Sequence, residues 1–199
     1  MRLLFLHADD FSYEVTGETS ITKQLDPIPP EMLKGNADEV LVCMISVEKG
    51  DGEKLQGITA KAAANIADQC AKLNVNRVFL YPYAHLSSEL EAPRTAAKVM
   101  ELLETTLSKS GNLEVKRAPF GFYKKFNIKV KGHPLSELGH TIRADEAAKE
   151  GSGLKAETHK ISRMAASGLL PVTNSRPVPI PSTILRYSIA PVIMKIPMR

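Results

Sequence analysis

The sequence predicts an α/β fold in which a mixed β-sheet is covered by two main helices. Short runs rich in β-branched and apolar residues recur along the chain, as strands do. Two longer segments between them carry apolar residues at the spacing of an amphipathic helix. At 199 residues and 43% hydrophobic, the chain is long enough for one good core and too short for two large domains. Strands interleaved with two helices therefore predict an α/β sandwich.

The first elements expected are strands. Residues 3–7 form a β-prone run that stops at acidic residues, and residues 11–15 alternate apolar and polar side chains. We expect these two runs to pair as a β-hairpin. A proline-rich loop at 27–30 follows, and the apolar segment 39–47 predicts a buried strand.

Helices and strands then alternate. Apolar residues at helical spacing predict one helix over 58–73 and another from Pro93 to Gly111. Further strands are expected at 76–83, 113–118 and 122–130.

Positive charge is concentrated at the end of the chain. The whole sequence has 26 basic and 22 acidic residues, but residues 153–199 hold seven basic residues and one acidic residue. The first 152 residues therefore carry a net charge of −2. Any RNA contact in residues 1–150 is expected to be local, without a broad basic surface. Residues 151–199 are expected to form a proline-rich, basic and poorly ordered tail.

The sequence also indicates in which cellular compartment the protein acts. No run approaches the 18 or more apolar residues that a membrane span needs, so we expect a cytoplasmic protein with no membrane partner. The two cysteines, Cys43 and Cys70, show no metal-binding spacing, and we interpret both as small buried hydrophobic residues.

Polar residues that suit a reaction site follow several of the predicted strands. They lie in the segments 45–49, 84–89, 118–124 and 131–138. Loops at strand ends often carry binding and catalytic residues.

Three side chains in these segments have both a functional and a purely structural interpretation. His85 orients a water or contacts an anionic ligand, or it only caps a strand end. Lys124 lies in a pocket among phenylalanines, or it is a solvated strand lysine like its neighbours. Glu137 accepts a hydrogen bond from a substrate ammonium or from Lys124, or it is solvated in a turn. Position alone does not decide between these alternatives.

Several other kinds of site are disfavoured. His133, Glu137 and His140 are spaced H-x3-E-x2-H, which is not the H-E-x-x-H pattern of a zinc helix. No glycine-rich phosphate loop and no Gly-x-Ser-x-Gly nucleophile turn occurs. We therefore expect no metal and no cofactor, and a reaction that uses activated water.

Four motifs resemble the amino-terminal editing domain of archaeal-type threonyl-tRNA synthetases. They are VLVCMISVEK at 40–49, YPYAHLSSEL at 81–90, APFGFYKKF at 118–126 and KGHPLSELGHTI at 131–142. The resemblance covers about residues 1–150, which we take as the editing domain, and it implies the fold of D-aminoacyl-tRNA deacylases. Residues 153–199 resemble no synthetase catalytic motif, so this chain alone is not expected to activate threonine.

The resemblance implies hydrolysis of serine wrongly attached to the 3′ end of threonine tRNA. Lys124 would hold substrate and water in line, His85 and Tyr123 would position the terminal adenosine, and Glu137 would complete the polar network. Backbone groups near four further residues would bind the substrate: Val47, Ala84, Phe120 and Gly121.

The resemblance also implies partners and leaves alternatives open. A homodimer is expected, together with a synthetase catalytic domain in cis or in trans. Two other functions stay open. One is a D-aminoacyl-tRNA deacylase of broader specificity, and the other is a module that binds the tRNA end without catalysis.

Overall fold

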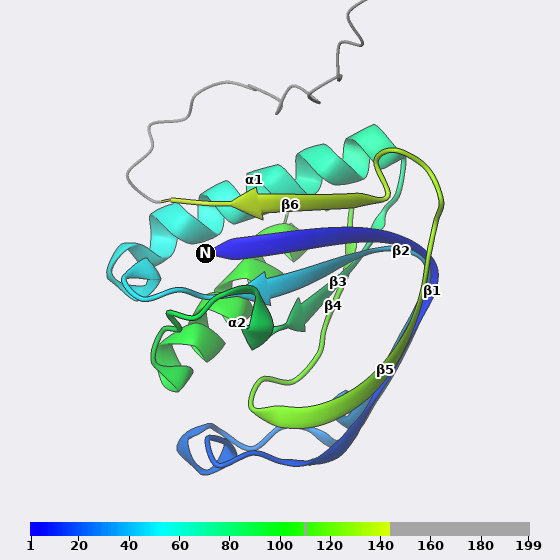
Figure 1. Ribbon diagram of the computed structural model, residues 1–199. Helices are drawn as coiled ribbons and strands as arrows, with labels where there is room; N and C mark the ends of the chain where they lie inside the picture. Colours follow the sequence, from blue (N-terminus) through cyan, green and yellow to red (C-terminus); the bar gives the residue numbers. More distant parts are fainter. Residues whose placement is uncertain (110, 144–199) are drawn as a thin grey trace, which may run out of the picture. The chain divides into compact units, whose positions relative to one another are not determined.

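A computed structural model describes residues 1–109 and 111–143. Six strands form one mixed sheet in the order β4-β3-β2-β1-β5, and β6 also pairs with β1 (Figure 1). The predicted fold class, a mixed sheet with two main helices, is confirmed. The predicted tail, residues 151–199, lies outside the described residues.

The longest strand, β1 (Arg2–Glu18), lies next to the end of the strand order, between β2 and β5. It pairs with β2 along one edge and with both β5 and β6 along the other. The predicted hairpin within this segment is therefore wrong. Asp9 does not start a turn, because it is an extra residue in the β1–β5 register and its carboxylate binds Lys129 and Lys131.

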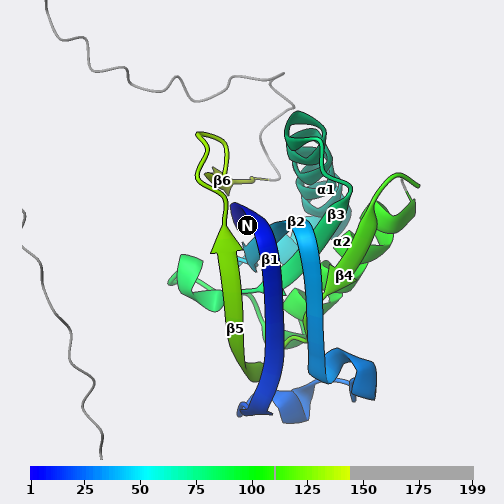
Figure 2. The same ribbon diagram turned by 90° about the vertical axis from the view of Figure 1, so that its right-hand side faces the viewer.

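Three strands run parallel and are joined by the two helices. They are β2 (Lys34–Ser46), β3 (Arg77–Pro82) and β4 (Glu114–Arg117), connected through α1 (Leu55–Leu73) and α2 (Pro93–Lys109). Both helices lie on the same side of the sheet (Figure 2). This arrangement brings the carboxyl ends of the three strands to one edge.

The last two strands are β5 (Phe122–Val130) and β6 (Glu137–Thr141). The sequence predicts β5 but not β6. Four short 3-10 turns complete the described elements: η1 (Thr22–Gln24), η2 (Pro30–Leu33), η3 (Asp51–Lys54) and η4 (Ala84–Leu86).

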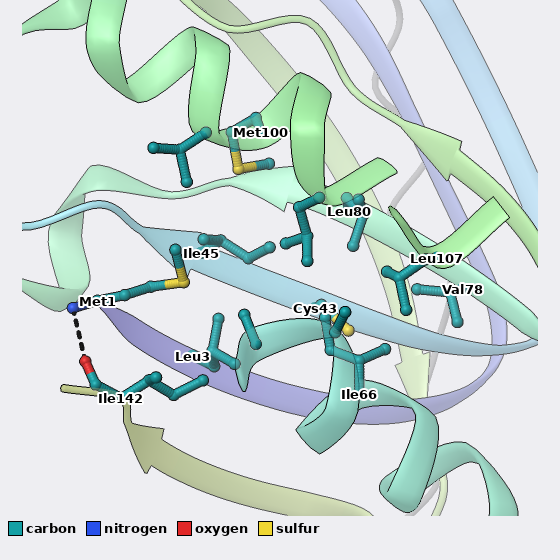
Figure 3. Packing of buried hydrophobic residues seen from close by; sticks show 14 of the residues in the cluster. Met1, Leu3, Cys43, Ile45, Ile66, Val78, Leu80, Met100, Leu107 and Ile142 are labelled. Carbon is teal, nitrogen blue, oxygen red and sulfur yellow. Dashed lines mark hydrogen bonds between the residues drawn. The ribbon is translucent and has the colours of Figure 1, made fainter. Parts of the chain in front are cut away.

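The main core lies between the sheet and the two helices (Figure 3). Alternate strand residues such as Leu41, Cys43 and Ile45 contribute to it, as the two-residue period of a strand requires. Ile66 of α1 and Met100 of α2 pack against them. Both cysteines are free thiols buried in this core, as predicted, and burial raises the pKa of each thiol.

A second, smaller core lies on the other face of the sheet, where the sheet curls. It is rich in aromatic rings, and Phe11 packs against Phe79 with 4.9 Å between ring centroids. Tyr13 meets Phe79 edge-on at 5.6 Å. These ring contacts pack the second half of β1 against Phe79 of β3.

Neither α1 nor α2 is long and apolar enough to cross a membrane, and the same holds for every other helix in the part of the chain described.

Candidate functional site

Two of the predicted site loops lie at the carboxyl edge of the parallel strands. The N–H of Tyr83, just after β3, donates to the carbonyl of Ile45 at the end of β2, at 2.8 Å. The N–H of Ala118, just after β4, donates to the carbonyl of Leu80 at 2.9 Å. The sheet thus holds the 84–89 and 118–124 segments next to each other.

Lys124 reaches this edge from β5. Its Nζ donates to the carbonyl of Pro119 at 2.9 Å and to that of Phe122 at 3.1 Å, and it lies 5.1 Å from the ring centroid of Tyr81. Burial lowers the pKa of Lys124 to about 8. An ammonium has three donors, and the two carbonyls take two of them. One donor remains for a ligand.

A row of aromatic rings connects Lys124 with His85. The ring of Tyr81 lies 6.5 Å from that of Tyr83, and Tyr83 meets the ring of His85 edge-on at 5.3 Å. His85 is exposed in η4. The structure therefore places these two predicted site residues at opposite ends of one aromatic wall.

Tyr123 precedes Lys124 on β5 and is 63% exposed. Consecutive strand residues point to opposite faces, so the two side chains diverge. Tyr123 is opposite Gly17 of β1, next to an extra residue in the β1–β5 register. Its phenol is free to meet a ligand at the rim, but it does not line the same wall as Lys124.

The turn before β5 is held by two threonines that the sequence did not single out. Gly121 has φ +85°, and its carbonyl accepts hydrogen bonds from the N–H of Thr19 at 3.2 Å and from the Thr19 hydroxyl at 2.6 Å. The Thr22 hydroxyl donates to the same oxygen. Neighbouring Phe120 packs against the main core. Together these contacts fix the turn whose carbonyls bind Lys124.

The remaining predicted side chain, Glu137, is exposed at the start of β6. It is opposite Leu6 of β1, whereas Lys124 is opposite Val15, nine residues further along the same strand. Among the described residues neither side chain bonds to the other. One chain therefore does not bring Glu137 and Lys124 together.

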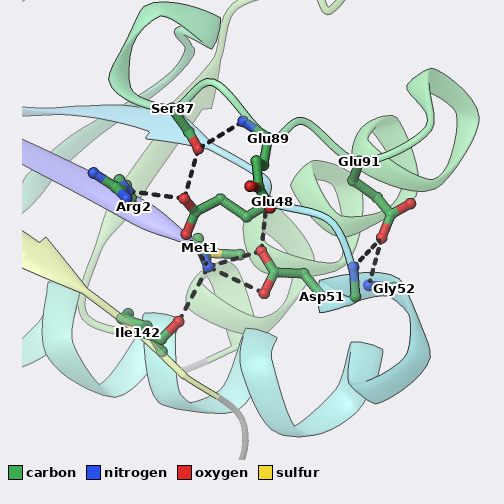
Figure 4. A network of polar contacts seen from close by, with 10 residues as sticks. Met1, Arg2, Glu48, Asp51, Gly52, Ser87, Glu89, Glu91 and Ile142 are labelled. Atoms are coloured by element: carbon green, nitrogen blue, oxygen red, sulfur yellow. Dashed lines mark hydrogen bonds and ion pairs between the residues drawn. The ribbon is translucent and has the colours of Figure 1, made fainter.

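A polar network holds the 84–90 loop to the end of β2 (Figure 4). Glu48 accepts hydrogen bonds from the Ser87 hydroxyl at 2.6 Å and from Arg2 Nε at 2.8 Å, and it lies 3.2 Å from the Met1 amino group. Burial acts to raise the pKa of Glu48, but these partners outweigh it and the pKa is lowered. Asp51 also binds the Met1 amino group, at 2.8 Å.

Predicted site residue Val47 lies beside this network and is buried. Its carbonyl accepts a hydrogen bond from the N–H of Glu91 at 3.0 Å. The Glu91 carboxylate in turn accepts from the N–H groups of Gly50 and Gly52. Val47 is thus held by a backbone hydrogen bond to Glu91, and the Ala84 carbonyl accepts from the N–H of Ser87 at 3.3 Å.

The H-x3-E-x2-H residues are not brought together as a metal site. His133 contacts His7, while Glu137 and His140 are three residues apart on β6 and so point to opposite faces. Within residues 1–109 and 111–143, no three metal-ligating side chains cluster.

Two open hollows lie near the sheet. One, of about 500 Å³, includes Ala84 and His85 in its lining. The other, of about 690 Å³, lies between η2 and β5 around Tyr13, Lys34 and Phe126. None of the eight predicted site residues lines the larger one, so the smaller hollow belongs to the candidate site.

Comparisons with a family model and with individual proteins indicate the same family. The model of a family described as the archaea-specific editing domain of threonyl-tRNA synthetase matches residues 1–142. A threonine–tRNA ligase of Thermococcus gammatolerans is 47% identical over 146 residues, which are 73% of this chain and 23% of the ligase. That of Methanothrix thermoacetophila is 42% identical over 162 residues, 81% of this chain and 25% of the ligase. The chain thus spans about a quarter of the length of these relatives.

Proposed function

Because the chain belongs to the family of archaea-specific editing domains of threonyl-tRNA synthetase, we propose that it hydrolyses the ester between serine and the 3′ end of threonine tRNA. The observation that carries the proposal is the position of Lys124. Its ammonium is desolvated, held by two carbonyls and a ring, and has one donor left. A cation fixed in this way stabilises negative charge that develops on an ester oxygen.

In the proposed reaction, water attacks the carbonyl carbon of the seryl ester and the bond to the ribose oxygen breaks. The water supplies one proton to the leaving ribose oxygen, and free serine and deacylated tRNA result. Lys124 donates to the substrate carbonyl or to the attacking water, and the neighbouring ribose hydroxyl assists the proton transfer, as the resemblance implies. His85 and Tyr123 hold the adenosine from the two sides of the site.

Selection against threonine requires a pocket that excludes a methyl group. The aminoacylation site of a synthetase that is shaped for threonine rejects serine only weakly, because one methyl group is worth roughly 1–3 kcal/mol of binding free energy. We place the serine side chain against the backbone at Val47 and Ala84, where hydrogen bonds between strand ends leave the walls little freedom to move. Gly121 and Phe120 form the opposite side, beside Lys124.

The role of Glu137 depends on the expected homodimer. In one chain Glu137 and Lys124 lie opposite β1 residues that are nine positions apart along the strand. A site that uses both side chains would therefore combine two copies of the chain. We further propose a synthetase catalytic domain as partner, in cis or in trans, and action in the cytoplasm, where threonine tRNA is charged.

The proposal is tested with the whole chain on four substrates. Seryl-tRNA(Thr) should be deacylated much faster than threonyl-tRNA(Thr), and D-seryl and D-threonyl esters measure the deacylase alternative. Equal rates on the L-esters, or none, refute the editing function. Rapid hydrolysis of the D-esters alone assigns the chain to the broader deacylase class.

A matched pair of lysine variants tests the site. Lys124→Met should remove most hydrolysis, because the ammonium beside the ester is lost. Lys125→Met is the control, since the Lys125 side chain is 68% exposed and its ion-pair partner within residues 1–109 and 111–143 is Glu14. Full activity of Lys124→Met would refute the assigned role. Binding of the seryl ester without turnover in the unaltered chain would favour a non-catalytic module.

A further inference from the structure

Arg2 lies in the wall of the hollow that contains His85, and the sequence motifs assign it no role. Its side chain is 52% exposed. The other residues that line this hollow come from η4 and the loop after it: Ala84, His85, Leu86, Ser87, Ser88 and Leu90. Arg2 is the first residue of β1, opposite Ser46 at the carboxyl end of β2. The antiparallel register therefore brings it to the edge where the proposed site lies.

The guanidinium of Arg2 is fixed by one of its nitrogens. Nε donates to Glu48 at 2.8 Å, and the same carboxylate oxygen accepts from the Ser87 hydroxyl. Among the described residues the two Nη groups of Arg2 have no hydrogen-bond partner. An arginine held at Nε keeps a planar pair of donors directed away from its partner, a geometry that matches phosphate oxygens.

The lining of the hollow suits an anion. It includes an arginine, a histidine and two serines, and no carboxylate. The first 152 residues carry a net charge of −2, so no broad basic surface attracts RNA to this face. A local cation is therefore needed wherever the backbone of the tRNA end passes.

We infer that Arg2 binds a phosphodiester of the tRNA 3′ end, on the side of the hollow where His85 meets the terminal adenosine. This inference rests on the proposed function. The bound group is the phosphate that links the terminal adenosine to the preceding nucleotide, because that phosphate is the anion nearest to the adenosine. Arg2 is thus a binding residue for the nucleic acid and makes no contact with the ester.

The test compares a substrate that has the phosphate with one that lacks it. In Arg2→Gln, KM for seryl-tRNA(Thr) should rise about five- to tenfold with kcat nearly unchanged, the effect of one lost phosphate contact. Hydrolysis of 3′-O-seryl-adenosine without a 5′ phosphate should stay within about twofold, since that substrate never used the contact. A plot of log kcat/KM for the tRNA substrate against log salt concentration should be less steep in Arg2→Gln than in the unaltered chain. The slope should differ by about 0.7, the contribution of one phosphate contact on a single strand.

Two further variants separate binding from structure. Arg2→Lys keeps the charge but not the paired donors, so it should give an intermediate KM. Arg77→Gln is the matched control, because Arg77 also pairs with a glutamate but lies at the opposite end of the parallel strands. It should behave as the unaltered chain. Thermal unfolding of every variant is measured alongside.

A binding measurement keeps this test independent of catalysis. A short RNA ending in CCA, with serine attached through a stable amide, should bind Arg2→Gln about five- to tenfold more weakly than the unaltered chain. Seryl-amide adenosine should bind both equally. Unchanged RNA binding, or equal loss on both ligands, overturns the inference. Absence of hydrolysis by the unaltered chain would refute the proposed function instead. The binding measurement would then still test whether Arg2 binds the phosphate.

Discussion

The Nδ1 atom of His7 lies 2.8 Å from the Nε2 atom of His133. His133 Nδ1 accepts a hydrogen bond from the N–H of Leu135 at 3.3 Å, so its proton is on Nε2 and points at His7. His7 then carries its own proton on Nε2, an atom that is buried without a partner. A proton added to His7 Nδ1 would remove the acceptor of this contact.

We predict that the fold loses stability as the pH falls below neutrality. Burial, and then the charges of His133 and Lys131, lower the pKa of His7 below the ordinary histidine value of 6.5, while Glu39 and Asp9 act in the opposite direction. Below pH 6.5 the unfolded chain binds a proton more readily than the folded chain does. The free energy of unfolding therefore decreases as the pH falls. Urea unfolding at pH 7.5 and pH 5 measures the effect.

His7→Gln should make this pH dependence shallower without removing it. His140, whose pKa is also lowered, first by burial, contributes in the same direction. The same difference between pH 7.5 and pH 5 in both proteins would contradict the assignment to His7.

Lys124→Met should stabilise the fold. Folding lowers the pKa of Lys124 from 10.5 to about 8, so the unfolded chain holds this proton more tightly. At pH 7 the desolvation of the charged lysine therefore opposes folding. Each pKa unit corresponds to about 1.4 kcal/mol, and the loss of a donor at Pro119 and Phe122 offsets part of the gain. We expect the free energy of unfolding to rise by about 1–2 kcal/mol at pH 7. In Lys125→Met it should change by less than about 0.5 kcal/mol.

The pH dependence of the unaltered chain gives an independent check on Lys124. Its stability should increase as the pH rises from 8 towards 10.5, the interval in which only the unfolded chain keeps the proton. The increase should be absent in Lys124→Met. A destabilised Lys124→Met protein would show that the lysine is a structural residue.

The ring of Tyr81 should support the lysine charge. Tyr81→Leu removes the π face that lies 5.1 Å from Nζ, an interaction worth roughly 0.5–2 kcal/mol, so the pKa of Lys124 should fall further and hydrolysis should slow. Tyr81→Phe keeps the face and should leave the pKa nearly unchanged. NMR titration of the lysine Nζ in both variants measures this, and equal titration in the two would rule out a contribution of the ring.

The turn at Gly121 should not tolerate a side chain. Its φ of +85° disfavours any other residue, and an added Cβ would lie 2.6 Å from Leu25 Cδ1. Gly121→Ala should cost about 1–3 kcal/mol of stability and lower kcat, because the turn sets the carbonyls that hold Lys124. Gly132→Ala is the control, since nothing lies within 4 Å of its added Cβ. Equal losses in both variants, by urea unfolding and deacylation, would contradict this explanation.

Local sequence patterns predicted the helices and the parallel strands well. Apolar spacing determined α1 and α2 because each buries one stripe of its surface against the sheet. The two-strand expectation for residues 3–15 failed for a physical reason. Leu3 and Phe5 face the helices, but Phe11 and Tyr13 face the other side, because the extra residue Asp9 reverses the alternation without ending the strand.

The site was predicted only in part, for a similar reason. Lys124 and His85 were named from motifs, and the structure connects them through tyrosine rings. Thr19 and Thr22 were not named, because their partner Gly121 lies about a hundred residues away in sequence. Arg2 was missed because its importance arises from the β1–β2 register and not from any local pattern.

The pairing of β1 sets the order in which this domain is able to assemble. β1 lies at the start of the described residues, yet Arg2 pairs with Thr141, and the Met1 amino group donates a hydrogen bond to the Ile142 carbonyl at 3.1 Å (Figure 3). During synthesis one edge of β1 therefore stays open until nearly all of the described residues have left the ribosome. High contact order of this kind slows folding and leaves an unpaired strand edge exposed to other chains. The nascent chain is thus most vulnerable to misassociation before β6 arrives, and shielding of that edge by a chaperone would act in this interval.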